Sequence, residues 1–133
     1  MGLEQRAEEL ERQGAMLRKR FEEVFWCPEL DTYALALDGN KKPCRVPTSN
    51  AGQVLFSGIA SAEHAAKVAD SLLSPQSFSG WGIRTVAKGA ARYNPMSYHN
   101  GSIWPHGGRT IGARRRDGPA DVPSGRRRTA SPP

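Results

Sequence analysis

The sequence predicts a mainly α-helical fold with a small β-hairpin and a long irregular loop, and three observations support this class. Apolar residues recur at alternating spacings of four and three between residues 3 and 24, which is the pattern of one helix face. A second helical pattern runs from 62 to 73, directly after Ser61, a residue type that favours helix N-caps. Extended segments are short and confined to one candidate hairpin between residues 32 and 46.

The first predicted helix is amphipathic and ends before Pro28, because proline cannot donate the backbone hydrogen bond that a helix interior needs. Gly14 is its weak point, since glycine costs up to about 1 kcal/mol relative to alanine in a helix. Such a helix cannot bury its apolar side alone, so we expect partner helices, and uncovered faces favour self-association. The apolar stripe comprises Leu3, Ala7, Leu10, Gly14, Leu17, Phe21 and Val24, extended by Phe25 and Trp26.

The central part of the chain predicts a hairpin followed by two helices. Residues 32–37 and 44–46 are the expected strands, because the Asp38-Gly39 pair between them is typical of a hairpin turn. Two short strands do not form a stable sheet alone, so this hairpin should decorate the helical scaffold. Asn50 is expected to cap a short helix through Phe56. The last helix should end at Ser74-Pro75 and bury Ala65, Val68, Ala69, Leu72 and Leu73.

Residues 78–106, FSGWGIRTVAKGAARYNPMSYHNGSIWPH, concentrate the chemistry of the chain. They contain no Asp or Glu, but they hold two of the three tryptophans, two of the three tyrosines and all but one of the histidines. Long irregular segments inside a compact domain are usually functional or disordered. The many large rings argue against disorder, so this segment is interpreted as a ligand-facing loop.

The side chains of this loop suit a sugar ligand. Sugars present apolar CH faces ringed with hydroxyls, so aromatic platforms beside amide and guanidinium donors match them. A rigid turn structure packed over a core explains the same composition about equally well, and residue types alone leave both interpretations open. Flat faces come from Trp81, Tyr93, Tyr98 and Trp104, and hydrogen-bonding groups come from Arg84, Asn94, His99, Asn100, Ser102 and His106.

Other site chemistries are disfavoured by the sequence. His99 and His106 lie seven residues apart with no carboxylate or thiol near them, so no metal site is expected. No glycine-rich phosphate loop or nucleophile elbow is present, and no cofactor is expected. His64 is interpreted as a surface or packing histidine.

The net charge of +6 belongs almost entirely to the last part of the chain. Residues 107–133 hold seven Arg against two Asp, a net of +5, whereas residues 1–106 hold twelve basic against eleven acidic side chains, a net of +1. This Arg/Gly/Pro-rich segment has almost no large apolar residue and is predicted to be a disordered tail.

The sequence predicts a cytoplasmic protein without a membrane partner. No apolar run approaches the length of a membrane span. The N-terminal residues are charged from Glu4 and lack the apolar core of a secretory signal. Cys27 and Cys44 have neither metal-site spacing nor the density of a disulfide scaffold, so reduced thiols are expected.

The strings SNAGQVLFSGIAS, TYALALDGNKKPCRV and YNPMSYHNGSIWPH resemble the C-terminal catalytic segment of bacterial amylo-α-1,6-glucosidase, or glycogen-debranching-type, proteins. The resemblance spans roughly residues 5–106. It implies that residues 1–106 are part of an (α/α)6 toroid in which loops at one end form a cleft for an oligosaccharide or α-glucan. It assigns to substrate binding or the cleft wall Trp81, Arg84, Tyr93, Asn94, Tyr98, His99, Asn100, Trp104 and His106.

The chain departs from that family after His106. The family continues with an Asp-Asn pair and an apolar helix, whereas this chain continues with Gly107-Gly108-Arg109. The change suggests the hypothesis of a frameshifted or truncated gene product.

Glycoside hydrolysis ordinarily needs two carboxyl groups, and none occurs between Asp70 and Asp117. Asp31 and Asp38 fit turn roles. The resemblance places the catalytic acid in a part of the family that precedes residue 1, so this chain alone is predicted to be inactive. The early glutamates are interpreted as a solvated helix face: Glu4, Glu8, Glu9 and Glu11.

A second hypothesis is a small binding module whose Arg-rich tail contacts nucleic acid or another polyanion through phosphates. The tail has no aromatic side chain for base stacking and the body is near neutral, so nucleic acid is the less favoured partner.

Overall fold

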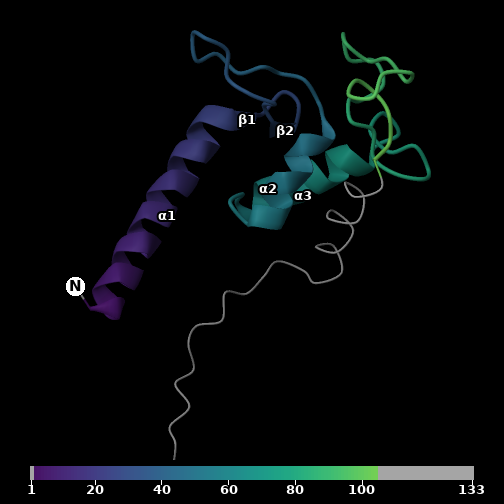
Figure 1. Cartoon of the computed structure of the whole chain (residues 1–133). Coiled ribbons are helices and arrows are strands. Elements are labelled where there is room, and N and C mark those ends of the chain that lie inside the picture. The colour runs from purple at the N-terminus through teal and green to yellow at the C-terminus, as the bar shows by residue number, and fades with distance from the viewer. Residues whose placement is uncertain (1, 105–133) are drawn as a thin grey trace, which may run out of the picture.

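The computed structural model describes residues 2–104, and these confirm the mainly helical class with a small antiparallel sheet (Figure 1). His106 and the predicted tail, residues 107–133, lie outside the described residues. In chain order the elements are α1 (Leu3–Phe25), β1 (Trp26–Cys27), β2 (Thr32–Tyr33), the 3-10 helix η1 (Ser49–Ala51), α2 (Gly52–Ser57) and α3 (Ala62–Leu73).

Helix α1 confirms the first predicted helix, although it ends one residue earlier than the apolar stripe suggests. Trp26 has extended backbone and belongs to β1. The amide of Gly2 donates to Oε1 of Gln5 at 3.3 Å, which ties the first turn. None of the side chains of α1 is buried, and its first turns extend away from the other elements (Figure 1). No helix within residues 2–104 is long and apolar enough to cross a membrane.

The strand prediction is confirmed in part. The regular sheet pairs Trp26 with Tyr33 and Cys27 with Thr32, so β2 is the start of the first expected strand but pairs with β1. Residues 34–46 still reverse direction near Asp38, whose Oδ1 accepts from the amides of Asn40 and Lys42, both at 2.8 Å.

This arm is the expected hairpin without regular strands: the amide of Leu35 donates to the carbonyl of Cys44 at 3.0 Å, the amide of Cys44 donates to the carbonyl of Ala36 at 2.8 Å, and Leu37 forms an isolated bridge with Pro43. Pro43 has no amide to donate, and Lys41 adopts a left-handed φ of 62°. Because of these two residues, the sides of the hairpin do not form regular strands next to the predicted Asp-Gly turn.

Helices α2 and α3 follow the prediction with one correction. Asn50 lies inside η1 and does not cap α2, because the chain enters α2 through a 3-10 turn. Gly58 ends α2 with a φ of 68°, a left-handed conformation that glycine adopts without steric cost. Ser61 caps α3 as predicted, and its Oγ accepts from the amide of His64 at 3.2 Å.

The core lies between α2, α3, β2 and the start of the long loop. Val68 is fully buried on α3, and Leu72 lies one turn further along the same face. Aromatic rings from the end of α1 pack against this core, which is how α1 is attached to the body. The buried cluster comprises Tyr33, Ala51, Leu55, Val68, Leu72 and Ile83, and Phe21, Phe25 and Trp26 are among the partly buried residues packed against it.

Residues 78–104, the described part of the predicted loop, contain no helix or strand, as expected. Isolated bridges organise them instead. Phe78 pairs with Ile83, Arg84 pairs with Ile103, and Thr48 pairs with Val86. The loop is therefore irregular but tied to itself and to the segment before α2.

Candidate functional site

The first part of the loop is a tight turn with a tryptophan at its tip. Ser79 closes the turn: its amide donates to the carbonyl of Gly82 at 2.9 Å, and its Oγ accepts from the amides of Trp81 and Gly82 at 3.2 and 3.1 Å. The side chain of Trp81 is 96% exposed. The sequence therefore places a large apolar ring in solvent on a fixed turn.

The last part of the loop gathers three rings. The Tyr98 and Trp104 ring centroids lie 4.7 Å apart, those of Tyr98 and His99 lie 4.8 Å apart, and those of His99 and Trp104 lie 5.5 Å apart. We call Tyr98, His99 and Trp104 the ring cluster. Nε1 of Trp104 donates to the carbonyl of Tyr98 at 3.1 Å and to Oγ of Ser102 at 3.0 Å, so the indole orientation is fixed.

A short backbone frame holds the ring cluster. The amide of Asn94 donates to the carbonyl of Asn100 at 2.7 Å, and the amide of Gly101 donates to Oγ1 of Thr85 at 2.9 Å. Oδ1 of Asn94 also accepts from the amide of Met96 at 3.0 Å, which closes a second turn. Residues 94–101 thus form a closed bend whose ends are joined.

Arg84 has a structural role at the base of this frame. Its amide donates to the carbonyl of Ser77 at 2.8 Å. One guanidinium nitrogen lies 3.4 Å from the carbonyl oxygen of Pro75 and 3.5 Å from that of Gln76, which are long hydrogen bonds. The guanidinium is therefore directed at the end of α3 rather than held by the ring cluster.

The structure thus brings together some of the predicted site residues and separates others. The rings of Tyr98, His99 and Trp104 meet, and Asn94 and Asn100 are joined through their backbones. Trp81 lies at the tip of its own turn. A shallow hollow of about 350 Å³ lies beside the end of α3, and none of the predicted site residues lines it. Its lining residues are Pro47, Ser71, Ser74, Gln76, Ser77, Ala87, Lys88, Gly89 and Ala90.

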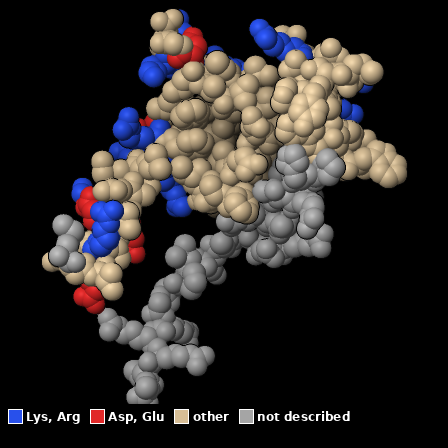
Figure 2. All heavy atoms as spheres, in the orientation of Figure 1, with Lys and Arg blue, Asp and Glu red and all other residues tan. Residues whose placement is uncertain are grey.

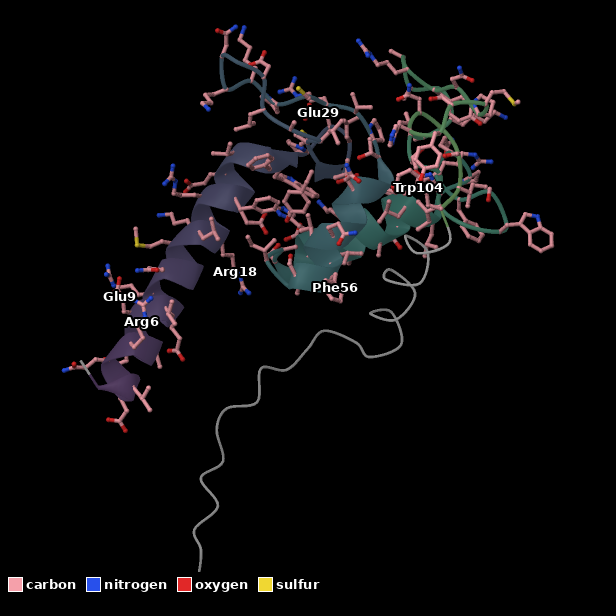
Figure 3. All side chains as sticks on the ribbon, viewed as in Figure 1. Arg6, Glu9, Arg18, Glu29, Phe56 and Trp104 are labelled. Atoms are coloured by element: carbon pink, nitrogen blue, oxygen red, sulfur yellow. The ribbon has the colours of Figure 1, made fainter. Side chains whose placement is uncertain are left out.

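Acidic side chains lie outside the loop, which holds Arg84, Lys88 and Arg92 but no Asp or Glu. In Figure 2 charged side chains lie over α1 and along the upper edge, and the centre of this face is largely uncharged. Figure 3 likewise shows Trp104 on the side of the molecule opposite to Arg6 and Glu9. Within residues 2–104 no group of three or more His, Cys, Asp and Glu side chains could hold a metal ion.

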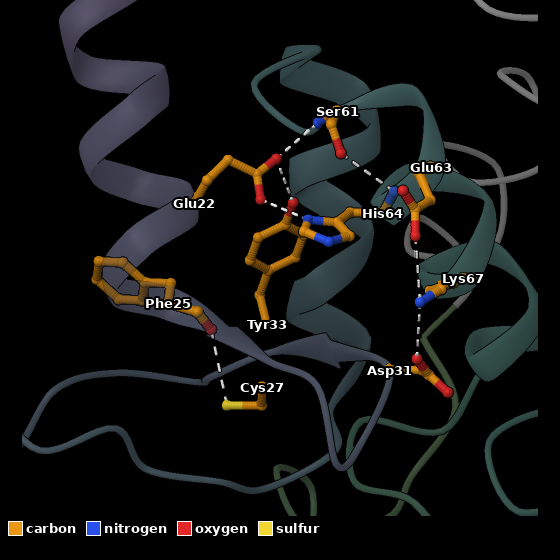
Figure 4. Close-up of polar contacts among 9 residues, drawn as sticks. All are labelled: Glu22, Phe25, Cys27, Asp31, Tyr33, Ser61, Glu63, His64 and Lys67. Carbon is orange, nitrogen blue, oxygen red and sulfur yellow. Dashed lines mark hydrogen bonds and ion pairs between the residues drawn. The ribbon is translucent and has the colours of Figure 1, made fainter.

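A polar cluster that sequence reasoning missed joins α1 to α3 (Figure 4). Oε1 of Glu22 accepts from the hydroxyl of Tyr33 at 2.9 Å and from the amide of Ser61 at 2.6 Å, and Oε2 lies 2.6 Å from Nδ1 of His64. Because a carboxylate only accepts, Nδ1 of His64 carries the proton. We call Glu22, Tyr33, Ser61 and His64 the Glu22 clasp.

The environment of the clasp stabilises the carboxylate form of Glu22. Burial raises its pKa, but the hydrogen bonds from Ser61, His64 and Tyr33 lower it by more, so the pKa lies below its ordinary value of 4.5. The amide of Ser61 is at the N-terminus of α3, where the helix dipole also favours a negative charge. Burial, with the hydrogen bond and charge of Glu22, raises the pKa of Tyr33 well above its ordinary value.

Aromatic packing fixes the histidine of the clasp. The His64 ring stacks on Trp26 with centroids 3.6 Å apart and planes 8° from parallel. Nζ of Lys67 lies over the Trp26 ring, 5.9 Å from its centroid. The packing interpretation of His64 is therefore correct, but the sequence did not reveal its carboxylate partner. The contacts of the clasp span 11, 39 and 42 residues, and no local pattern reports them.

The comparisons agree with the predicted class of enzyme domain. No curated protein matches the chain in a sequence search. The family model of the mannosylglycerate hydrolase MGH1-like glycoside hydrolase domain matches residues 1–108, which include every element of the fold, the ring cluster and the Glu22 clasp. The match confirms the predicted glycoside hydrolase class, while amylo-α-1,6-glucosidase stays a prediction. With most of its 133 residues matched, the chain belongs to the mannosylglycerate hydrolase MGH1-like family of glycoside hydrolase domains.

Proposed function

We propose that the loop of residues 78–104 supplies one wall of the sugar-binding cleft of a glycoside hydrolase with an (α/α)6 toroid. The observation that carries the proposal is the ring cluster, which lies on a bend closed by the backbones of Asn94 and Asn100, in a segment without carboxylates. Family membership gives the enzyme class, and the ring cluster supports the place of the loop in it.

The ring cluster has the physical properties of a sugar platform. Tyr98 is 68% exposed, and His99 is exposed beside it. Trp104 is held by two hydrogen bonds, so little conformational entropy is lost when a sugar stacks on these rings. Stacking of a sugar CH face buries apolar ring surface, at about 25 cal/mol per Å². The exposed side chain of Asn94 is then placed to bond sugar hydroxyls through its amide nitrogen.

We propose a neutral oligosaccharide, of the α-glucan class, as the ligand of this wall. Nε1 of Trp104 donates to a backbone carbonyl and a serine hydroxyl, both uncharged groups, and Arg84 points toward the end of α3. A neutral sugar fits these groups better than a sugar acid does. Mannosylglycerate, which the family name includes, carries a carboxylate and is the alternative that the test distinguishes.

Sugar binding should depend on Trp104. Titration of the full chain with maltooligosaccharides should quench tryptophan fluorescence saturably. Trp104→Ala should weaken this binding by about tenfold or more, because the indole supplies stacking surface worth on the order of 1.4 kcal/mol. Met96→Ala is the matched control, since Met96 is an exposed apolar side chain on the same loop.

Two further measurements test the role of Trp104 and the class of sugar. Met96→Ala should bind as the unmodified chain does, and mannosylglycerate should compete poorly with maltooligosaccharide. Tighter binding of mannosylglycerate would replace the glucan proposal with a sugar acid. Absence of saturable quenching by either ligand would overturn the role of the loop as a sugar wall.

We also propose that this chain does not hydrolyse glycosides by itself. The loop has no Asp or Glu, and Glu22 already accepts three hydrogen bonds within the clasp. Hydrolysis needs a carboxyl pair placed about 5–10 Å apart across the bond. Incubation with α-1,6-linked and α-1,4-linked oligosaccharides should release no glucose above a buffer control. Release that persists after repurification and disappears in Glu22→Gln would contradict the proposal.

A further inference from the structure

The first half of α1 is a helix without a covering partner in the described chain. Leu3, Leu10 and Leu17 are 91%, 51% and 61% exposed. Further along α1, the guanidinium of Arg18 donates to the carbonyl of Gly58 at 2.8 Å and ties the helix to the body. Isolated helices of this length are only marginally stable in water, so a covering partner would stabilise residues 3–17.

The apolar stripe of this free part alternates large and small side chains. Leu3, Leu10 and Leu17 occupy one position of a seven-residue repeat, and Ala7 and Gly14 occupy the other. Two helices with such a repeat pack by inserting side chains of one into holes of the other. In a parallel pair of identical helices equivalent positions meet, so Gly14 faces Gly14 and leaves a void. In an antiparallel pair Leu10 meets Gly14 and Leu17 meets Ala7, which fills the space.

The charges along α1 favour the same arrangement. Residues 3–13 hold four Glu and two Arg, a net of −2, whereas residues 14–21 hold Arg18, Lys19 and Arg20 without an acid, a net of +3. An antiparallel pair places the acidic part of each helix beside the basic part of the other. A parallel pair places like charges together, which is unfavourable.

We propose that two copies of this chain associate through antiparallel packing of their α1 helices. The register that pairs Leu10 with Gly14 also pairs Leu17 of each copy with Ala7 of the other. The packed stripe ends before Phe21, which packs on the core of its own chain, so the two bodies lie toward opposite ends of the helix pair. The first turns of α1 project away from the other elements (Figure 1), and the leucines of its stripe are exposed to a second copy.

The stripe is tested by light scattering on the full chain over a wide range of protein concentration. The unmodified chain should convert from monomer to dimer, and Leu10→Glu should weaken the dimer by about tenfold or more, because it places a charge in the two central packed layers, one from each copy. Met16→Glu is the matched control. Met16 is 56% exposed, but it lies on the outer side of the helix, so its dimer should persist.

The orientation is tested by charge reversal within one chain. Lys19→Glu with Arg20→Glu makes both halves of α1 acidic and should weaken an antiparallel dimer. Adding Glu4→Lys and Glu8→Lys to the same chain makes the first half of α1 basic and the second half acidic, and this should restore the antiparallel dimer. Circular dichroism should show helix content close to that of the unmodified chain at dimer-forming concentrations.

A monomer at every concentration, or a dimer that Leu10→Glu leaves intact, would overturn the proposal. Equal dimerisation of the partly and fully reversed chains would overturn the antiparallel orientation.

Discussion

Replacement of Glu22 with alanine is expected to lower the free energy of unfolding by about 3 kcal/mol at neutral pH. The substitution leaves the Tyr33 hydroxyl, the Ser61 amide and Nδ1 of His64 without their shared acceptor. The Tyr33 hydroxyl and the His64 ring are partly removed from water, so solvent does not fully replace their lost hydrogen bonds, whereas the Ser61 amide is exposed. Urea denaturation followed by far-ultraviolet circular dichroism measures the change.

The adjacent glutamate provides a matched control for this prediction. Glu23 has 59% of its side chain exposed and lies 4.0 Å from Lys19 on the same helix. An exposed pair of this kind contributes only about 0–1 kcal/mol, so Glu23→Ala should leave the midpoint nearly unchanged. Equal destabilisation by the two substitutions would show that loss of helix charge, not loss of the clasp, causes the effect.

The Glu22 clasp should also make stability depend on acid. Because the folded-state pKa of Glu22 lies below 4.5, its stabilising effect is fully present above about pH 4.5 and is lost as the pH falls through the folded-state pKa. Glu22→Gln removes the titrating group, so its stability should be lower at neutral pH but flatter below pH 4.5. Denaturation midpoints at several acidic pH values, compared between the two chains, test this sign.

The sequence predicted those parts of the fold that depend on local patterns. The four-and-three spacing located α1, and Ser61 located the start of α3, because helix periodicity and N-caps act over a few residues. The hairpin was located correctly, but its regular strands were not, because Asp38-Gly39 specifies a turn and not the length of its strands. Trp26 was assigned to the helix because its apolar character fits a helix stripe as well as a strand.

The candidate sites show the same division between local and distant contacts. The loop composition identified the rings of Tyr98, His99 and Trp104, which lie within seven residues of one another. Glu22 was missed because it looks like any other glutamate of an amphipathic helix. Its structural role depends on Tyr33 and His64, which tertiary packing brings to the Glu22 carboxylate from other elements. Only the fold distinguishes this carboxylate from its solvated neighbours.

Gly101→Ala is expected to disrupt the frame of the ring cluster and to weaken sugar binding by about tenfold or more. A Cβ atom at this position would lie 2.8 Å from Cε2 of Tyr93 and 2.9 Å from the carbonyl oxygen of Asn94. The second contact is with backbone, so the bend that joins Asn94 to Asn100 must open. Overpacking of this kind costs about 1–3 kcal/mol. Fluorescence titration with maltooligosaccharide and a thermal melt measure the two effects.

Gly89→Ala separates loss of the frame from general strain in the loop. Gly89 has a φ of +91° and open space where a Cβ would lie, so alanine there meets backbone strain without a collision. Its melting temperature should fall, but the distances within the ring cluster should be kept and sugar should bind normally. If Gly101→Ala and Gly89→Ala lower binding equally, close approach at Gly101 is not what positions the rings. If Gly101→Ala alone loses binding, the bend between Asn94 and Gly101 is the element that holds Tyr98 and Trp104 in place for a ligand.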